Sequence, residues 1–225
     1  MKQTAISRIC AAALPFFALS AAADVFSEIR ENRVEALEET LAADPSAANS
    51  ATERGVTPLG YAIVQRRFEA AFELLSAGAD PNAATAGSLV TPLHRAADKG
   101  DAGLVRLLLE NKADPAAAAA NGFTALHFAA RTNSADCVAL LVSAGAPVEA
   151  ADANGRTALH IAAKYDAAAA AGKLVEAGAS LSAADKFGYV PAALASDPAL
   201  VEALGGGAAG AGAAGASAGE APAAA

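Results

Sequence analysis

The sequence is poor in the side chains that usually crosslink or catalyse. It contains no tryptophan, only two cysteines and three histidines, and 5% aromatic residues. Cys10 lies in an N-terminal segment that we expect to be removed, which leaves Cys137 alone, so the mature chain has no intramolecular disulfide. The fold must therefore be held by packing. With 54% hydrophobic residues, many of them alanine, close packing of helices is expected.

A hydrophobic run long enough to cross a membrane is also missing. Lys2 and Arg8 give a positive start, Ile9–Leu19 is apolar, and Ala21–Ala23 has the form of a cleavage site. The apolar stretch is too short to span a bilayer. We therefore expect a cleavable signal peptide over residues 1–23, a mature chain from Asp24 in a bacterial periplasm (alternatively secreted), and no membrane insertion after cleavage.

Positive charge is in short supply. The formal net charge is -8, and loss of Lys2 and Arg8 with the signal changes it to -10. Nucleic-acid binding relies on basic side chains that neutralise phosphates, so this acidic balance argues against a nucleic-acid partner.

A short motif recurs through the rest of the chain. The heptapeptides TPLGYAI, TPLHRAA, TALHFAA, TALHIAA and VPAALAS begin at Thr57, Thr91, Thr124, Thr157 and Val190. Their starts are 34, 33, 33 and 33 residues apart. A fixed period of this size indicates a stacked array, because one such unit is too small to bury its own apolar face.

Each unit has the signals of two helices. In the fourth copy Thr157 is a good N-cap, and Leu159 begins an apolar stripe at helical spacing. A second helix carries Leu174 and ends at Gly178, the residue type that best adopts the left-handed cap conformation. Lys112 occupies this glycine position in its own repeat. If φ is positive there, Lys112 is strained.

The pattern D-x-x-G-x-T-P-L-H-x-A-A, followed by a second helix and G-A-D-x-N, resembles the ankyrin repeat. This resemblance implies an all-α ankyrin-repeat solenoid of stacked helix–loop–helix units joined by short β-hairpin loops. Helical stretches around Val25–Glu31 and Val34–Leu41 suit a polar N-terminal cap, and a short helix over Ala199–Leu204 suits a truncated C-terminal cap. The expected units are an N-cap (24–51), repeats (52–85, 86–118, 119–151 and 152–184) and a C-cap (185–204).

The tail from Gly205 to Ala225 is almost entirely glycine and alanine. It has no large apolar side chain to bury, so we expect a disordered extension. Two G-x-G-x-x-G matches and one G-x-S-x-G match occur in it, but each motif needs a preceding strand and a following helix. We therefore expect no enzyme activity and no cofactor.

The three histidines occupy one position in successive repeats. Packed helices lie roughly 8–10 Å apart, whereas zinc ligands must all reach within about 2 Å of one ion, so no shared metal is expected. The resemblance implies instead that this histidine bridges repeats by hydrogen bonds. The structural motif then consists of Thr91, His94, Thr124, His127, Thr157 and His160.

Cys137 falls where the second helix of its repeat carries a buried apolar residue, so we interpret it as a small buried hydrophobe. A redox-sensitive or intermolecular thiol is the alternative, which export to an oxidising compartment would allow.

In ankyrin proteins the loop tips and the exposed part of the first helix form a concave binding face. On that register the predicted partner-binding residues are Arg54, Lys99, Phe123, Arg131, Arg156, Lys164, Tyr165, Lys186 and Tyr189. The face as a whole has six basic side chains against three acidic ones and most of its aromatic residues in the C-terminal half. Arg and Tyr often anchor interfaces, which favours a partner with an acidic surface. The alternative is that these charges only keep a solvent-facing surface soluble.

The sequence thus predicts a non-enzymatic, monomeric module that binds a protein partner on its concave face. Two alternatives remain open: an accessory or protective factor for one exported enzyme, such as a peroxide-defence enzyme, and a secreted effector directed at a host. The residues do not name the partner, because a repeat fold does not record what it binds.

Overall fold

The computed structural model describes residues 21–206 of the chain. Within these residues the chain forms eleven α-helices and two 3₁₀ turns, and no strand. In chain order they are α1 (Ala21–Glu31), α2 (Val34–Ala43), η1 (Pro45–Asn49), α3 (Pro58–Val64), α4 (Phe68–Ser76), α5 (Pro92–Asp98), α6 (Ala102–Glu110), α7 (Ala125–Arg131), α8 (Ala135–Ser143), α9 (Ala158–Lys164), α10 (Ala168–Glu176), η2 (Pro191–Leu194) and α11 (Pro198–Ala203).

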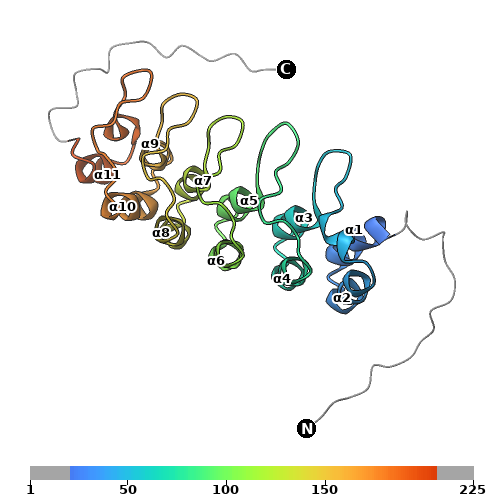
Figure 1. Cartoon of the computed structure of the whole chain (residues 1–225). Helices are drawn as coiled ribbons and strands as arrows, with labels where there is room; N and C mark the ends of the chain where they lie inside the picture. Colours follow the sequence, from blue (N-terminus) through green and yellow to red (C-terminus); the bar gives the residue numbers. More distant parts are fainter. Residues whose placement is uncertain (1–20, 207–225) are drawn as a thin grey trace, which may run out of the picture.

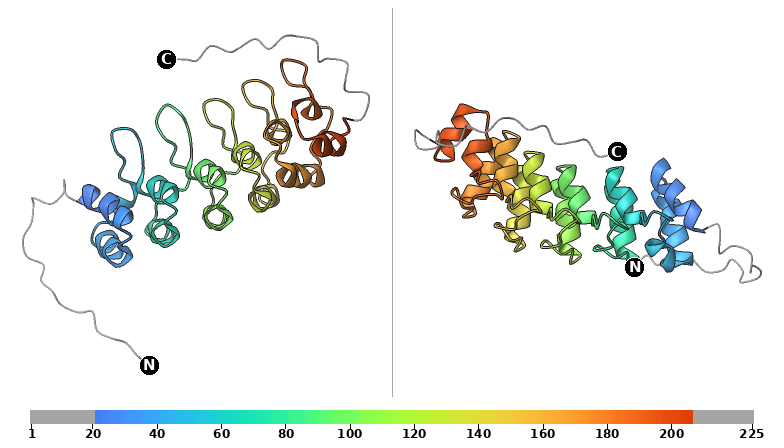
Figure 2. Two further views of the ribbon diagram at one scale, coloured as in Figure 1. Left: turned by 180° about the vertical axis from the view of Figure 1, so that it is seen from behind. Right: turned by 90° about the horizontal axis from the view of Figure 1, so that it is seen from above.

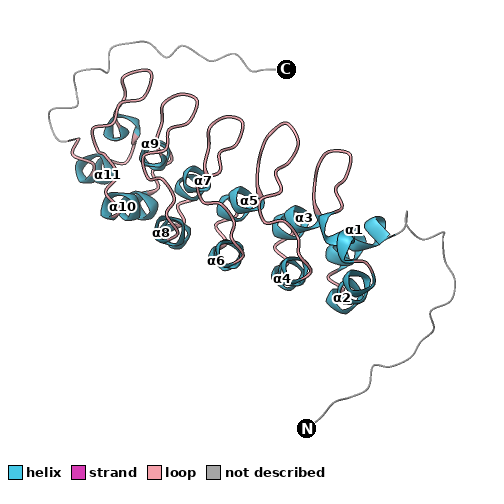
Figure 3. Ribbon diagram, in the orientation of Figure 1, coloured by secondary structure: helices cyan, strands magenta, loops and turns pink. Residues whose placement is uncertain are grey.

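The helices stack as pairs in two rows (Figure 1). The odd-numbered helices α1 to α9 form the row beside the long loops, and the even-numbered helices α2 to α10 form the other row. Two further views show the same one-dimensional stacking of pairs (Figure 2), and the loops rise from the odd-numbered row (Figure 3). α3 packs against α5, α5 against α7, α7 against α9, and α9 against η2. The predicted all-α solenoid is confirmed.

The first helix of each full repeat begins at its threonine, as predicted. Thr57 accepts a hydrogen bond at Oγ1 from the backbone N–H of Gly60 (3.1 Å). Thr91, Thr124 and Thr157 hold the corresponding place at α5, α7 and α9. A proline is first in α3 and α5, where its missing N–H costs nothing because the first amides of a helix lack helical partners.

The core runs continuously through the array rather than forming one centre. The leucine of each full heptapeptide (Leu59, Leu93, Leu126, Leu159) is completely or almost completely buried. Alanines such as Ala129 and Ala162 fill the contact between neighbouring first helices. Because alanine adds little bulk, successive helices approach closely, and each repeat covers the apolar face of the one before it.

The loops between repeats are tighter than the predicted β-hairpins. Two backbone hydrogen bonds close each one, such as those from Ala119 N to Phe123 O and from Gly122 N to Ala119 O (both 2.8 Å). Among the described residues only Ala118 and Thr124 form an isolated antiparallel bridge. One or two bonds fix a turn but do not extend into a ladder, so the loops contain turns in place of strands.

The two ends differ from the internal repeats. The N-terminal pair α1 and α2 covers both predicted helical stretches, and α1 begins three residues before Asp24. At the other end η2 is only a 3₁₀ turn, and Val190 before it has no hydroxyl to cap it. α11 begins at Pro198, one residue before the predicted start, because Asp197 accepts from Ala199 N–H (3.0 Å). The predicted signal peptide up to residue 20 and the tail from residue 207 lie outside the described residues.

Lys112 has the conformation that the sequence suggested. Its φ is +67°, whereas Gly78, Gly145 and Gly178 have φ of +87° to +89° at the same place in other repeats. A side chain with a Cβ is disfavoured in this left-handed region. The Lys112 side chain is exposed.

We predict that Lys112→Gly stabilises the array by up to about 1 kcal/mol, because it removes the strain while glycine's extra freedom in the unfolded chain offsets part of the gain. Thermal unfolding followed by circular dichroism measures the effect. Lys173→Gly, which places glycine inside α10, is the control and should lower the melting temperature. A lower melting temperature for Lys112→Gly would contradict the prediction.

Candidate binding face

Three Thr–His pairs join the repeats to one another. In each pair the histidine Nδ1 accepts from the threonine backbone N–H at 3.1–3.2 Å. The Nε2 atoms of His94, His127 and His160 then donate to a loop carbonyl of the following repeat, each at 3.0 Å. The bridging role implied by the resemblance is therefore present at all three histidines, and it fixes the base of each loop on the helix before it.

This network requires neutral imidazoles. Nδ1 accepts and Nε2 donates, so each ring carries one proton, on Nε2. Burial lowers the pKa of His94 and outweighs the opposing effect of the Phe123 carbonyl. Burial likewise lowers the pKa of His127, against the carbonyl of Arg156 and the charge of Asp152. A second proton at Nδ1 would displace the threonine N–H, so protonation opposes folding.

Arg156, a predicted partner-binding residue, is engaged inside its own loop. Its Nε and Nη2 donate to Asp152 Oδ2 at 2.9 and 2.7 Å, and the side chains are 19% and 1% exposed, respectively. Burial raises the pKa of Asp152, but hydrogen bonds from the side chain and backbone of Arg156 and from Asn154 N–H outweigh it and leave the pKa below its ordinary value. We assign Arg156 to loop structure, because breaking this pair would strand a buried carboxylate.

Two more predicted residues have partners within the array. Arg131 donates to Asp98 of the preceding repeat and lies over the Phe128 ring, 5.0 Å from its centre. Phe123 stacks on the His127 ring at 5.1 Å and contacts Phe128 edge-on at 5.5 Å. Both side chains are half-buried. Arg131 joins neighbouring repeats, the Phe123 ring packs within its own repeat, and both offer a partner only their outer edges.

The largest accessible side chains of the face lie in the last full repeat and the loop after it. Tyr165, just after α9, is 54% exposed, and Phe187, at the tip of the loop before η2, is 71% exposed. Lys164 is exposed beside Tyr165. Lys186 is exposed too, although its Nζ donates to the Ala153 carbonyl at 2.6 Å. These four residues offer aromatic area and positive charge to a partner.

The remaining predicted residues are divided between the two ends. Arg54 is exposed in the first loop, and Lys99 is exposed where α5 ends. Tyr189 is half-buried, and its carbonyl accepts from His160. The structure thus does not gather the nine predicted residues in one patch.

Sequence reasoning missed Leu89. Its φ is +53° and its side chain is 51% exposed. The corresponding positions in the other loops are glycines, and at Gly122 an added Cβ would lie 2.9 Å from the backbone of the next loop. The replacement of a repeated glycine by leucine was visible in the sequence. An exposed apolar side chain in a disfavoured conformation makes Leu89 a candidate contact residue.

The described residues contain no group of three or more His, Cys, Asp or Glu side chains placed to hold a metal ion. Cys137 is completely buried in α8, and this burial raises the pKa of its thiol. Its placement favours the interpretation as a small buried hydrophobe over that of a reactive thiol, which needs exposure and thiolate character.

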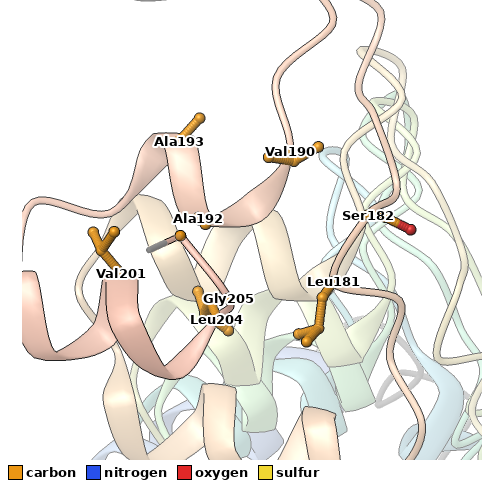
Figure 4. Close-up of a pocket in the computed structure, with 9 residues that line it drawn as sticks. Leu181, Ser182, Val190, Ala192, Ala193, Val201, Leu204 and Gly205 are labelled. Carbon is orange, nitrogen blue, oxygen red and sulfur yellow. The ribbon is translucent and has the colours of Figure 1, made fainter. Parts of the chain in front are cut away.

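An open pocket of about 260 Å³ lies at the C-terminal end (Figure 4). Ser182 supplies its only polar side chain, and no ionisable side chain lines it. The lining residues are Leu181, Ser182, Val190, Ala192, Ala193, Val201, Leu204, Gly205 and Gly206. This pocket therefore has no acid–base or nucleophile–base pair of the kind that catalysis requires.

We predict that the free energy of unfolding decreases as the pH falls below 6.5, the ordinary pKa of histidine. His94 and His127 have lowered pKa values in the folded chain, so the unfolded chain binds protons at a higher pH than the folded chain does. Proton binding then stabilises the unfolded chain relative to the folded chain. Their full contribution is present above pH 6.5 and is lost as the pH falls through the folded pKa values. Urea unfolding between pH 7 and 5 measures this slope.

His127→Gln is the control, because it removes one of the two histidines whose pKa is lowered and should flatten the slope even though it also lowers stability. Asp152 does not interfere, since its lowered pKa acts only below its ordinary value of 3.8. A free energy of unfolding that stays constant or rises toward pH 5 would contradict the prediction.

Comparison with known proteins identifies the repeats. Residues 93–185 match the family model of ankyrin repeats (3 copies). The comparison with curated proteins gives no match. Within residues 21–206 no helix has both the length and the apolar character needed to cross a membrane. The matched repeats, the stacked helical pairs and the histidine bridges between them together show an ankyrin-repeat array over residues 93–185.

Proposed function

We propose that the chain is a non-enzymatic module that binds one protein partner on the face formed by its loops and odd-numbered helices. Ankyrin repeats indicate protein–protein interaction. The observation that carries the finer proposal is the exposure of Tyr165 and Phe187 on this face in a chain with few aromatic residues. Large aromatic side chains that are left exposed are typical anchors of an interface.

The proposed anchors differ in part from the nine residues that the sequence suggested. Arg131 and Arg156 are paired with Asp98 and Asp152, so their charges are already balanced. Lys164 and Lys186 stay exposed next to the two aromatic side chains. We propose a partner surface that accepts the two rings and places acidic side chains beside the lysines.

Rigid presentation is the proposed mechanism. The loops are fixed at their base by the histidine bonds and at their tips by bonds such as Lys186 N to Asn154 O (2.9 Å). A face that is ordered before binding loses little conformational entropy when a partner docks. A few anchors then suffice for affinity, and the stacked repeats set the distances between them.

Affinity capture tests this proposal, with the chain itself as bait. A Tyr165→Ala/Phe187→Ala bait should lose the partner that the unchanged bait retains, because it lacks both anchors. Phe68→Ala/Phe72→Ala is the matched control: it removes two rings of α4 with similar exposure from the row away from the loops, and it should retain the partner. Equal retention by the unchanged bait and the Tyr165/Phe187 bait would contradict the proposal.

We also propose that the chain is exported to the periplasm and that its repeat units follow the boundaries given by the sequence period. The basic start, the apolar stretch Ile9–Leu19 and the small residues Ala21–Ala23 support a cleaved signal. Cleavage there would leave Asp24 to open α1. Amino-terminal sequencing of the protein purified from cells should give Asp24 as the first residue, and Met1 would contradict export by this signal.

A further inference from the structure

The turns between the paired helices carry an unusual concentration of positive charge near the N-terminal end. Arg30 lies one residue before the end of α1, beside the first turn, which contains Arg33. Arg66 and Arg67 lie in the second turn, and Lys99 begins the third. We call these five residues the turn rim. They belong to three successive repeats of a chain whose formal net charge is -8.

Hydrogen bonds make the turn rim one continuous feature. Arg67 Nη2 donates to the carbonyl of Arg30 (3.2 Å), which ties the second turn to the first. Arg66 Nη2 donates to the carbonyl of Lys99, which ties the second turn to the third. The second turn is therefore tied to the turns on both sides of it along one edge of the array.

The charges of the turn rim are only partly balanced. Glu31 pairs with both Arg33 (3.0 Å) and Arg30 (3.7 Å), and Asp101 lies 3.9 Å from Arg66. Glu31 and Asp101 thus pair with three of the five basic side chains. The side chains of Arg30, Arg33 and Arg66 are each more than half exposed, so their donors remain open to a ligand.

Backbone conformation points to the same place. Arg66 has a φ of +56°, and the next repeats carry Gly100 and Asn133 in this part of the turn, both also at positive φ. Glycine and asparagine tolerate the left-handed region, whereas arginine has no local advantage in it. An arginine held there in a disfavoured conformation suggests that its charge serves a purpose other than the turn itself.

We propose that the turn rim is a second interaction surface, at the N-terminal end of the array and away from Tyr165 and Phe187, and that it binds an acidic segment of a protein partner. Three turns span about two helix spacings of 8–10 Å each, which one phosphate cannot bridge but an extended segment of roughly six residues can. Guanidinium groups bind carboxylates through paired hydrogen bonds, which suits aspartate and glutamate side chains along such a segment.

Neighbouring residues favour a short segment over an anionic membrane or a nucleic acid. Glu35 and Glu69 stand just inside α2 and α4, beside the basic turns, and both are exposed. Farther along this edge Asn133 and Asp166 stand in the place of Arg66. Of the two basic residues that end α7 and α9, Arg131 is paired with Asp98 and only Lys164 is exposed. A flat bilayer or a long polyanion would also contact these acidic and neutral positions, whereas a short segment need contact only the turn rim.

Fluorescence anisotropy with a labelled peptide of alternating Glu and Ser tests the proposal. The chain should bind this peptide at low ionic strength and release it as salt is added, and a Gln–Ser peptide should not bind. Arg30→Glu/Arg33→Glu should weaken binding by about tenfold. Arg106→Glu/Lys112→Glu makes the same change in net charge elsewhere and should alter binding by less than about twofold.

Further arms keep the test decisive. Circular dichroism establishes that each variant is folded, and Arg30→Gln/Arg33→Gln serves if the glutamate variant melts early. Tyr165→Ala/Phe187→Ala should bind the acidic peptide normally. The proposal for the turn rim and the proposal for the loop-side face are therefore tested independently. Absence of peptide binding, equal weakening by the control variant, or tighter binding to phosphatidylglycerol vesicles or an oligonucleotide than to the peptide would overturn the proposal.

Discussion

The contact between one helical pair and the next is the constraint on which the rest of this structure depends. A single repeat has a leucine and several alanines to bury and too few partners of its own, so it is stable only beside its neighbours. Burial of Leu93, Leu126 and Leu159 supplies the apolar part of this contact. The bond from each histidine to the next loop carbonyl supplies its direction and fixes where the loop leaves the helices.

The same contact decides which surface residues are available for binding. Arg131, Arg156 and Phe123 lie at positions that a repeat alignment treats as exposed, yet each has a partner in the array. The array uses their charge and area to join repeats or to stiffen loops. The anchors left for a partner are Tyr165 and Phe187, which lie where the last full repeat meets the incomplete C-terminal cap.

Acidic and basic side chains are distributed unevenly along the molecule, and the net charge does not show this. The net charge is negative, and even-numbered helices such as α2 carry exposed glutamates. The turn rim nevertheless gathers basic residues from three repeats along one edge. These residues are far apart in sequence, from Arg30 to Lys99, and only the stacking of the turns brings them together.

The sequence by itself determined the repeat period, the helix starts at the threonines and the strained site at Lys112, and its resemblance to ankyrin repeats implied the bridging role of the histidines. All of these depend on local patterns that recur every 33 or 34 residues. The tertiary structure alone decided that Arg156 pairs with Asp152, that Arg131 pairs with Asp98, and that arginines of separate turns lie along one edge of the array. A periodic pattern specifies the position of a residue within its repeat, whereas the partner of a side chain depends on which residue the neighbouring repeat places within reach.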